Sequence, residues 1–418
     1  MVLCRPRDYH ALFKLVWYAP VFTAVGVRES VRACVSVTPS AGNTPDGSER
    51  GLQELSLARQ VGLPNVGKSS IFNAFAEATG ATARVGNFPF CTIDPNHAKV
   101  ALLDPRLDQL AKLASSERVV PTYVEVVDIA GLVKGASEGA GLGNRFLQNI
   151  RETHAIVHVV RCFDDHEITH VDGSVDPVRD IEVINTELIL ADLEVIDRRL
   201  QRARKKLSAV HGEAELTGLA TLEARLNQGI PARAVALTEQ EAAAVRDLNL
   251  LSAKPILYAA NVSEEHLARG CEYSSRVESI AAAERSMVVR VSAAVECSLA
   301  EMGEADRAEY LAALGVTDGG SAKLARGCYE LLELRAFFTV GPAETRAWTI
   351  RAGDRAPTAA SKIHSDFEKA FIRAETISFD DYVRYGSEKV ARDAGACRSE
   401  GKEYVVQDGD VILFRTGR

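Results

Sequence analysis

The 418-residue sequence lacks the patterns of zinc-binding, disulfide-framework and membrane-spanning proteins. Its eight cysteines include no Cys-x-x-Cys pair, and none lies in a Cys/His cluster at zinc-ligand spacing. No stretch approaches the roughly 18 consecutive apolar residues that a membrane span requires. These absences predict a soluble protein of a reducing intracellular compartment.

The sequence also lacks an excess of positive charge. Its formal net charge is -8, so nothing attracts the whole chain to nucleic acid or to an anionic membrane. We therefore expect no membrane and no DNA partner, and any RNA contact must come from a local basic patch. A hydrophobic fraction of 46% and a charged fraction of 25% are ordinary for a globular protein, and the length allows two or three domains.

Residues 1–54 differ in composition from the rest of the chain. A mixed apolar and basic start leads into residues 38–50, which are rich in Ser, Thr, Gly and Pro and resemble a linker. One interpretation is a transit peptide, which would place the protein in a mitochondrion or plastid. Because Asp8 and Glu29 dilute the acid-poor signature, we favour a dispensable or wrongly predicted extension and a cytoplasmic location.

Between residues 62 and 300, short β-branched runs alternate with helical stretches. This alternation predicts a doubly wound α/β domain with a mainly parallel sheet. Each predicted strand ends at small or polar residues, where ligands bind in open α/β sheets. The predicted strands are residues 124–128, 156–161, 256–261 and 287–292.

An insertion at about residues 185–249 shows helical periodicity and no strand pattern. Its apolar residues recur at spacings of 4, 3, 4, 3 and 4, as at the a and d positions of a coiled coil. These residues are Ile189, Leu193, Ile196, Leu200, Ala203 and Leu207. Leucines at 219, 222 and 226 and a capping box of Thr238 with Glu241 predict return helices. We expect an antiparallel helical arm.

The predicted domains are therefore a nucleotide-binding domain at 55–333, which carries the arm, and a small α+β domain at 334–418. Strand patterns at 347–350 and 411–414 support the second domain. Asp408-Gly409-Asp410, immediately before the last run, predicts a turn.

Residues 62–69 read Gly-Leu-Pro-Asn-Val-Gly-Lys-Ser, a complete phosphate-binding loop. Such a loop turns backbone N–H groups toward phosphates, and the helix expected near Lys68 adds its positive N-terminal dipole. Lys68 is the predicted catalytic cation on the β- and γ-phosphates, and Ser69 the predicted Mg²⁺ ligand. The predicted nucleotide contacts in this segment are Asn65, Val66, Gly67, Lys68, Ser69 and Ser70.

The residues before this loop form a poor buried strand. A phosphate-binding loop follows a central strand, yet Arg59 and Gln60 suit such a position badly. The local alternation predicts at most a half-buried strand. A faulty N-terminal gene boundary would explain the mismatch.

Two further segments have the order of nucleotide-sensing switches. Thr92, in a predicted loop, can complete the Mg²⁺ shell, and Asp128 ends a predicted strand in the pattern Asp-x-x-Gly. Asp128 would hold Mg²⁺ through water, and the Gly131 amide would meet the γ-phosphate. A glycine-rich run at 135–143 follows, as either a second switch or a plain flexible loop.

The group that orients the attacking water is not evident from these motifs. Leu132 stands where many related switches have glutamine. His170, in a loop beyond the strand at 156–161, is a candidate, and an ordinary surface histidine is the alternative.

Base recognition is predicted at Asn261-Val262-Ser263-Glu264, with Ser292 and Ala293 closing around the base. A guanine-specific switch has Asn-Lys-x-Asp here. The predicted base contacts are Asn261, Val262, Glu264, Ser292 and Ala293.

These motifs together resemble the YchF group of Obg-like ATPases, in the translation-factor-related class of P-loop GTPases. The resemblance covers residues 61–418 and rests on the motifs at 65–69, 87–96, 128–142 and 261–264. Residues 346–350, 363–367 and 401–404 look like that family's TGS domain, although Ser361 stands where a glycine is usual. The N-terminal extension has no family counterpart.

The resemblance implies an ATPase with a hydrophobic residue in place of the catalytic glutamine, which Leu132 matches. It also implies a coiled-coil arm, a catalytic histidine at His170, and a TGS domain linked to ribosome or RNA contact. The arm carries a basic run that is either an RNA contact or a solvated helix face. This run is Arg198, Arg199, Arg202, Arg204, Lys205 and Lys206.

The predicted function is an ATP-hydrolysing nucleotide switch that binds ATP better than GTP and contacts the ribosome or ribosomal RNA. Mg²⁺ is the expected cofactor, and K⁺ is a candidate second ion. Two alternatives stay open: a ribosome- or RNA-binding module with incidental hydrolysis, and a conventional GTPase.

Overall fold

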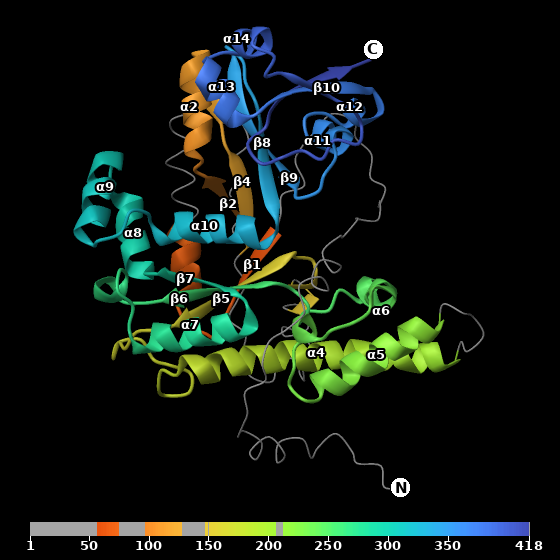
Figure 1. Ribbon diagram of the computed structural model, residues 1–418. Helices are drawn as coiled ribbons and strands as arrows, with labels where there is room; N and C mark the ends of the chain where they lie inside the picture. Colours follow the sequence, from red (N-terminus) through yellow and green to blue (C-terminus); the bar gives the residue numbers. More distant parts are fainter. Residues whose placement is uncertain (1–56, 75–96, 128–146, 149, 206–211, 418) are drawn as a thin grey trace, which may run out of the picture.

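The computed structural model describes residues 57–74, 97–127, 147–148, 150–205 and 212–417. The chain forms two six-stranded sheets, with the C-terminal sheet above the N-terminal one in Figure 1. The N-terminal extension, the loop with Thr92, and the segment that contains Asp128, Gly131 and the glycine-rich run lie outside the described residues.

The N-terminal sheet is mainly parallel, as predicted. In spatial order its strands are β2 (His97–Leu102), β4 (Thr122–Val127), β1 (Leu57–Val61), β5 (Ala155–Arg161), β6 (Ile256–Asn261) and β7 (Met287–Val291). Every neighbouring pair runs parallel except β2 with β4. The predicted doubly wound fold is therefore confirmed, and β4 to β7 match the four predicted strands.

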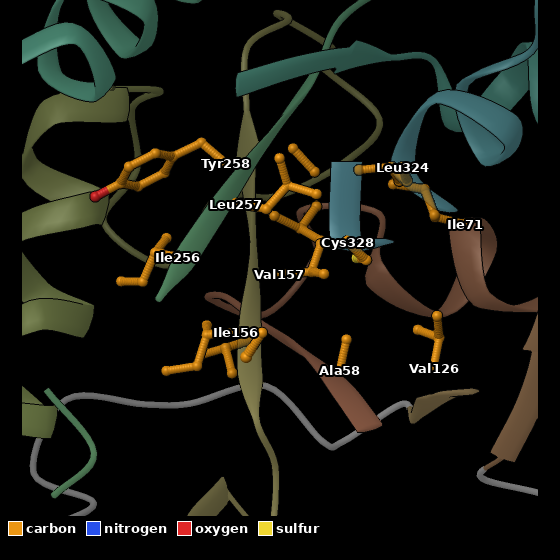
Figure 2. Close-up of a cluster of buried hydrophobic side chains, with 14 of the residues drawn as sticks. Ala58, Ile71, Val126, Ile156, Val157, Ile256, Leu257, Tyr258, Leu324 and Cys328 are labelled. Carbon is orange, nitrogen blue, oxygen red and sulfur yellow. The ribbon is translucent and has the colours of Figure 1, made fainter. Parts of the chain in front are cut away.

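Helices cover both faces of this sheet. Leu257 on β6 faces α10 (Gly320–Leu331), where a Cβ on Gly327 would lie 3.1 Å from the leucine Cδ2. The next residue, Tyr258, points the other way and donates its hydroxyl to Glu284 of α7 (Glu272–Glu284) at 2.9 Å. Figure 2 shows the two side chains on opposite sides of the strand, as the two-residue period of a strand requires. The core is built on this alternation.

The strand before the phosphate-binding loop is more deeply buried than its sequence predicts. β1 lies between β4 and β5, and residues 58–61 are all buried. The expectation of a half-buried strand is wrong, because pairing with a strand on each side places β1 at the sheet centre. Gln60 is 0% exposed, and neither atom of its amide has a hydrogen-bond partner among the described residues.

Arg59 is buried on the opposite face of β1 from Gln60. Its Nη2 lies 4.0 Å from Glu152 Oε2. Burial lowers the pKa of the guanidinium, and the nearby carboxylate raises it by a smaller amount. Its Nε has no partner among the described residues. Both polar side chains thus cost stability at the centre of the sheet.

The helical arm is present as two packed helices, α4 (Pro177–Lys205) and α5 (Gly212–Leu226), along the lower edge of Figure 1. Of the predicted α4 seam, Ile189, Ile196 and Leu200 are buried, Leu193 and Ala203 are partly buried, and Leu207 lies outside the described residues. The buried seam consists of Ile189, Ile196, Leu200, Leu219, Leu222 and Leu226. Each such side chain contributes about 1.5–3 kcal/mol when fully buried. Coiled-coil geometry as such stays a prediction.

Short helices return the chain from the arm to the sheet. They are η3 (Ala232–Ala234), α6 (Glu239–Val245) and η4 (Arg246–Leu248). The capping box predicted from Thr238 and Glu241 begins α6. The buried carboxylate of Asp192, on α4, accepts the N–H groups of Leu251 and Ser252 at 2.8 and 2.7 Å. This contact fixes the arm to the segment that enters β6.

Three further helical elements follow β6 and β7. They are η5 (Glu264–His266), α8 (Ala293–Glu301) and α9 (Glu304–Ala313). The buried carboxylate of Glu296, on α8, accepts the Gly320 N–H at 2.6 Å and so caps α10. Since α10 contacts β2, β6 and β7 as well as β8 of the second sheet, this cap links both parts of the chain.

The C-terminal sheet takes one strand from the N-terminal half of the chain. Its order is β11 (Arg398–Glu400), β10 (Phe371–Ile377), β12 (Val411–Thr416), β8 (Leu334–Thr339), β9 (Glu344–Arg351) and β3 (Arg118–Val120). The predicted strands at 347–350 and 411–414 lie in β9 and β12, and Gly409 makes the predicted turn with φ 90°.

Five helices pack on this second sheet. They are α2 (Pro105–Ala114), α11 (Ala356–Ser361), α12 (Ser365–Lys369), α13 (Phe379–Tyr385) and α14 (Glu388–Asp393). Leu107 and Leu110 of α2 share a core cluster with Phe338 of β8. Ser361 ends α11 and donates its hydroxyl to the Thr358 carbonyl at 2.7 Å, so the serine is accommodated within a helix. Among the described residues, no helix is long and apolar enough to cross a bilayer.

We expect Gln60→Met to stabilise the protein. Methionine has a similar shape and removes two buried polar atoms without partners, which should raise the free energy of unfolding by about 1–3 kcal/mol. Calorimetry would show this as a higher Tm. Gln240→Met, at an exposed position of α6, is the matched control and should leave Tm unchanged. An unchanged or lower Tm for Gln60→Met would contradict the account of β1.

Candidate nucleotide-binding site

The loop after β1 has the backbone that a phosphate-binding loop requires. The chain turns through Asn65 and Gly67, with φ of 61° and 94°, and becomes helical at Lys68. Gly67 cannot be replaced easily, because an added Cβ would lie 2.3 Å from the Asn261 side-chain nitrogen as well as at positive φ. Backbone N–H groups at a helix start are suited to anions.

The polar side chains of this loop differ in exposure. Lys68 is 6% exposed, and its Nζ donates to the Leu63 carbonyl at 2.6 Å, which draws the ammonium across the loop. Ser69 and Ser70, in the first turn of the helix, are exposed. The structure therefore places cation, hydroxyls and helix N-terminus in one segment.

Asn261 joins this loop to the predicted base loop. Its side-chain Nδ2 donates to the Val66 carbonyl at 2.9 Å, and its Oδ1 accepts the Ala293 N–H at 3.0 Å. The residue is 1% exposed. Both polar ends of the carboxamide thus bind the protein backbone, so Asn261 braces the site and presents little surface to a base.

The other predicted base-loop residues lie around this brace. Val262 is buried and donates its N–H to the Val291 carbonyl at 2.8 Å. Ser292 is buried beside it, and its hydroxyl has no partner among the described residues. Glu264 is exposed at the start of η5, and its Oε1 accepts the Tyr310 hydroxyl at 3.0 Å. The role of Glu264 in base recognition stays a prediction.

His170 lies in a loop that contacts the phosphate-binding loop. Asn65 Nδ2 donates to the Thr169 carbonyl at 3.1 Å. The predicted alternative of a surface histidine is wrong, since the ring is buried and its Nε2 lies 2.9 Å from Asp180 Oδ2 on α4. The sequence placed His170 near the site, and the structure adds the carboxylate that holds it.

A second histidine near the site is unsuited to proton transfer. His158, on β5 and paired with Val61, is fully buried against the Tyr258 ring. Burial, reinforced by the charges of Arg233 and Lys68, lowers the pKa of His158 to about 3. The ring is therefore neutral at physiological pH.

Three residues with roles in this site were not identified from the sequence. The Arg161 guanidinium donates to the carbonyls of Phe163, Asp165 and Ile168, and so shapes the loop that leads to His170. Tyr310 and Asp180 hold Glu264 and His170. Arg161 could have been identified from the sequence, because it is a charged residue at the end of a predicted buried strand. The other two lie on helices that follow their partners in the chain, and no local pattern marks them.

The His170 region brings together three side chains of metal-ligating type, and the Arg179 guanidinium lies beside two of them. Ligand atoms of His170, Asp172 and Asp180 lie within 4.8 Å of one another. Arg179 lies between the carboxylates, with its Nη2 3.2 Å from Asp180 and its Nε 3.5 Å from Asp172. The positive charge that these acids require is therefore supplied by the protein.

Two of the predicted metal ligands, Thr92 and Asp128, and the predicted phosphate contact Gly131 lie outside the described residues. β4 ends at Val127, and its pairing with β1 brings Val127 opposite Arg59. The chain thus leaves β4 at the same edge of the sheet as the phosphate-binding loop. The roles of the three residues stay predictions.

Comparison with known proteins gives matches over both parts of the chain. A family described as "50S ribosome-binding GTPase" matches residues 60–192. A family named YchF-GTPase_C and described as "Protein of unknown function (DUF933)" matches residues 334–417.

Full-length relatives are also found. The protein named "Ribosome-binding ATPase YchF" of Shigella flexneri is 51% identical over 356 residues, which cover 85% of this chain and 97% of that protein. Its namesake in Bacillus subtilis (strain 168) is 48% identical over 359 residues, with the same coverage. The solved structure of the Schizosaccharomyces pombe YchF GTPase matches with a TM-score of 0.78 at 37% identity, over 86% of this chain and 97% of that one. Together with the phosphate-binding loop braced by Asn261, these similarities show that the chain belongs to the YchF family of P-loop nucleoside triphosphatases.

Proposed function

We propose that this protein is an ATP-hydrolysing switch that binds ATP in preference to GTP and acts on ribosomes. The observation that carries the nucleotide site is the Asn261 brace, which brings the phosphate-binding loop and the base loop together. Relatives named ribosome-binding ATPases support the activity and the partner. The proposed division into a nucleotide domain at 55–333 and a TGS-like domain at 334–418 follows from the sequence.

The residues of the loop fit a magnesium nucleotide. Mg²⁺ takes oxygen ligands, and Ser69 is an exposed hydroxyl-bearing residue in the first turn of the helix. Ser69 would hold the ion, with Thr92 and Asp128 as the ligands proposed from sequence, and K⁺ is a candidate second ion. When bound, Mg²⁺ neutralises charge on the β- and γ-phosphate oxygens. Lys68 adds a protein cation, and the backbone of residues 65–67 orients the phosphates. His170 is the proposed orienter of the attacking water.

The preference for ATP rests on Glu264. Guanine recognition requires a carboxylate that accepts two bonds from the N1–H and the exocyclic amine. Glu264 is one methylene longer than aspartate, and its Oε1 already accepts the Tyr310 hydroxyl. Val262 supplies no lysine stem to pack over the base. Adenine needs no such carboxylate, because backbone groups can meet its amine and its ring nitrogen.

Some basic residues of the arm form ion pairs within the protein, so fewer than the six are proposed to contact the ribosome. Arg199 pairs with Glu215 and Asp247 and so holds the arm together, and Arg198 lies 3.6 Å from Glu194. Arg202 and Arg204 are exposed, and they are the described residues of the run best placed to contact RNA. The proposed contact is a phosphate contact, since no aromatic residue interleaves for base stacking.

The alternative function, a ribosome-binding module with incidental hydrolysis, uses the same arm and the C-terminal sheet. One experiment separates this alternative from the ATP-hydrolysing switch. If Lys68→Ala abolishes hydrolysis but leaves ribosome binding and cellular role intact, the module is the better description.

Lys68→Ala and Ser69→Ala should each weaken MgATP binding or turnover at least about tenfold, because each removes a charged or metal-ligating contact to the phosphates. Titration calorimetry and a phosphate-release assay measure the two effects. Lys112→Ala, at an exposed lysine of α2, is the control and should behave as wild type. Unchanged affinity and turnover in both loop variants would remove the assignment of this loop.

Wild-type protein should bind MgATP more tightly than MgGTP by about 1–3 kcal/mol, the scale of one lost bidentate base contact. Competitive titration of both nucleotides gives this ratio. Because Val262 is buried, Val262→Lys would place a charge in the core, so the converse test is Glu264→Asp with Tyr310→Phe. This pair shortens the carboxylate and frees its oxygen, and should shift the ratio toward GTP. Glu265→Asp, at the exposed neighbour, is the control. A wild-type preference for GTP would favour the conventional GTPase.

Reversing Arg202 and Arg204 to glutamate should weaken ribosome co-sedimentation and make it less sensitive to salt. Loss of two phosphate contacts lowers the slope of log K against log salt by about two. Arg269 and Arg276 are exposed and lie outside the two arm helices α4 and α5, and their reversal is the control. A salt titration that matches wild type would reject the arm as the contact.

A further inference from the structure

The His170 side chain is held by a buried carboxylate. Its Nε2 lies 2.9 Å from Asp180 Oδ2, and the two side chains are 4% and 3% exposed. The other oxygen of Asp180 accepts from Arg179 Nη2 at 3.2 Å. The carboxylate is therefore fixed from both sides.

The second ring nitrogen identifies the tautomer. The Asp172 backbone N–H donates to His170 Nδ1 at 3.1 Å, so Nδ1 bears no proton. The ring is then neutral, with its proton on Nε2 and donated to Asp180. A neutral imidazole has one donor and one acceptor, and both are in use. In this position His170 can neither accept a proton from a water molecule nor donate one.

The backbone immediately before His170 is fixed independently of this pair. Asn65 binds the Thr169 carbonyl, and Arg161 binds the Ile168 carbonyl at 2.9 Å. The loop can therefore stay beside the phosphate-binding loop while the imidazole changes rotamer. Among the described residues, the side-chain hydrogen bonds that must break are those to Asp180 and to the Asp172 N–H.

We infer that Asp180 is a positioning residue that keeps His170 away from the attacking water. We call this the withheld state, and hydrolysis requires that the hydrogen bond between Asp180 and His170 break. The inference rests on the proposed role of His170 in orienting the attacking water. Asp180 lies in the first turn of α4, the helix that continues into the arm. The residue that withholds His170 is thus on the same rigid element as the proposed ribosome contact.

Asp180→Ala should raise the single-turnover rate of MgATP hydrolysis roughly tenfold, the scale of one hydrogen bond to a charged group, and leave the KM for ATP unchanged. Asp180→Asn, which keeps the shape and a neutral acceptor, should give a smaller rise and serves if the alanine variant does not fold. Asp176→Ala is the matched control: the Asp176 carboxylate accepts the Val178 N–H at the start of α4, and among the described residues no hydrogen bond joins it to His170. It should leave the rate unchanged.

The same substitution in a His170→Ala background should have no effect on the rate. A fall or no change with Asp180→Ala, or an equal rise without His170, overturns the inference. A fall specifically would show that Asp180 orients His170 for catalysis.

A nuclear magnetic resonance measurement separates this inference from the proposed function. Imidazole ¹⁵N shifts of wild-type protein should show the Nε2–H tautomer of His170, and Asp180→Ala should lose the downfield Nε2–H proton signal that a hydrogen bond to a carboxylate gives. If His170→Ala hydrolyses ATP at the wild-type rate, the proposed role of His170 fails although the tautomer persists. If wild-type protein shows a different tautomer, the withheld state itself is refuted.

Discussion

The nucleotide site depends on one buried carboxamide. Asn261 binds the backbone at Val66 and at Ala293, two segments more than two hundred residues apart in the chain. Neither bond competes with water, because the residue is buried, and losing either partner would leave a buried polar group unsatisfied at a cost of about 1–3 kcal/mol. The glycine at position 67 is part of the same constraint, since its missing Cβ makes room for the amide.

From this brace the contacts continue in two directions. On one side, Ala293 opens α8, whose Glu296 caps α10, and α10 contacts both sheets. β3 and α2 add a second connection, because they come from the nucleotide half and pack on the C-terminal sheet. On the other side, Asn65 and Arg161 hold the His170 loop, and Asp180 links that loop to the arm. A nucleotide-dependent change therefore has physical routes to both the arm and the C-terminal unit. The routes combine hydrogen bonds, such as those of Asn65, Arg161 and Asp180, with the apolar packing of α2 and α10.

Much of the fold was predictable because its signals are local. β-branched runs locate β4 to β7, and the 4-3 spacing of apolar residues locates the packed face of α4 and α5. β1 was misjudged because Arg59 and Gln60 lower its strand signal, whereas pairing with two neighbours outweighs that composition. β3 pairs with β9 of the C-terminal sheet, which the sequence did not predict. A three-residue strand has too short a pattern to indicate which sheet it will join.

The sequence by itself determined the phosphate-binding loop, because fixed glycine, lysine and serine spacing is a local requirement of phosphate geometry. It also determined the order of the motifs and thus the family. Only the tertiary structure decided how the side chains are used. Asn261, predicted to meet the base, is a brace, and His170, predicted beside the site, is withheld by a carboxylate ten residues later on another element. The physical reason is that hydrogen-bond partners for buried polar groups are chosen by packing between elements, and no spacing along the chain specifies which groups will meet.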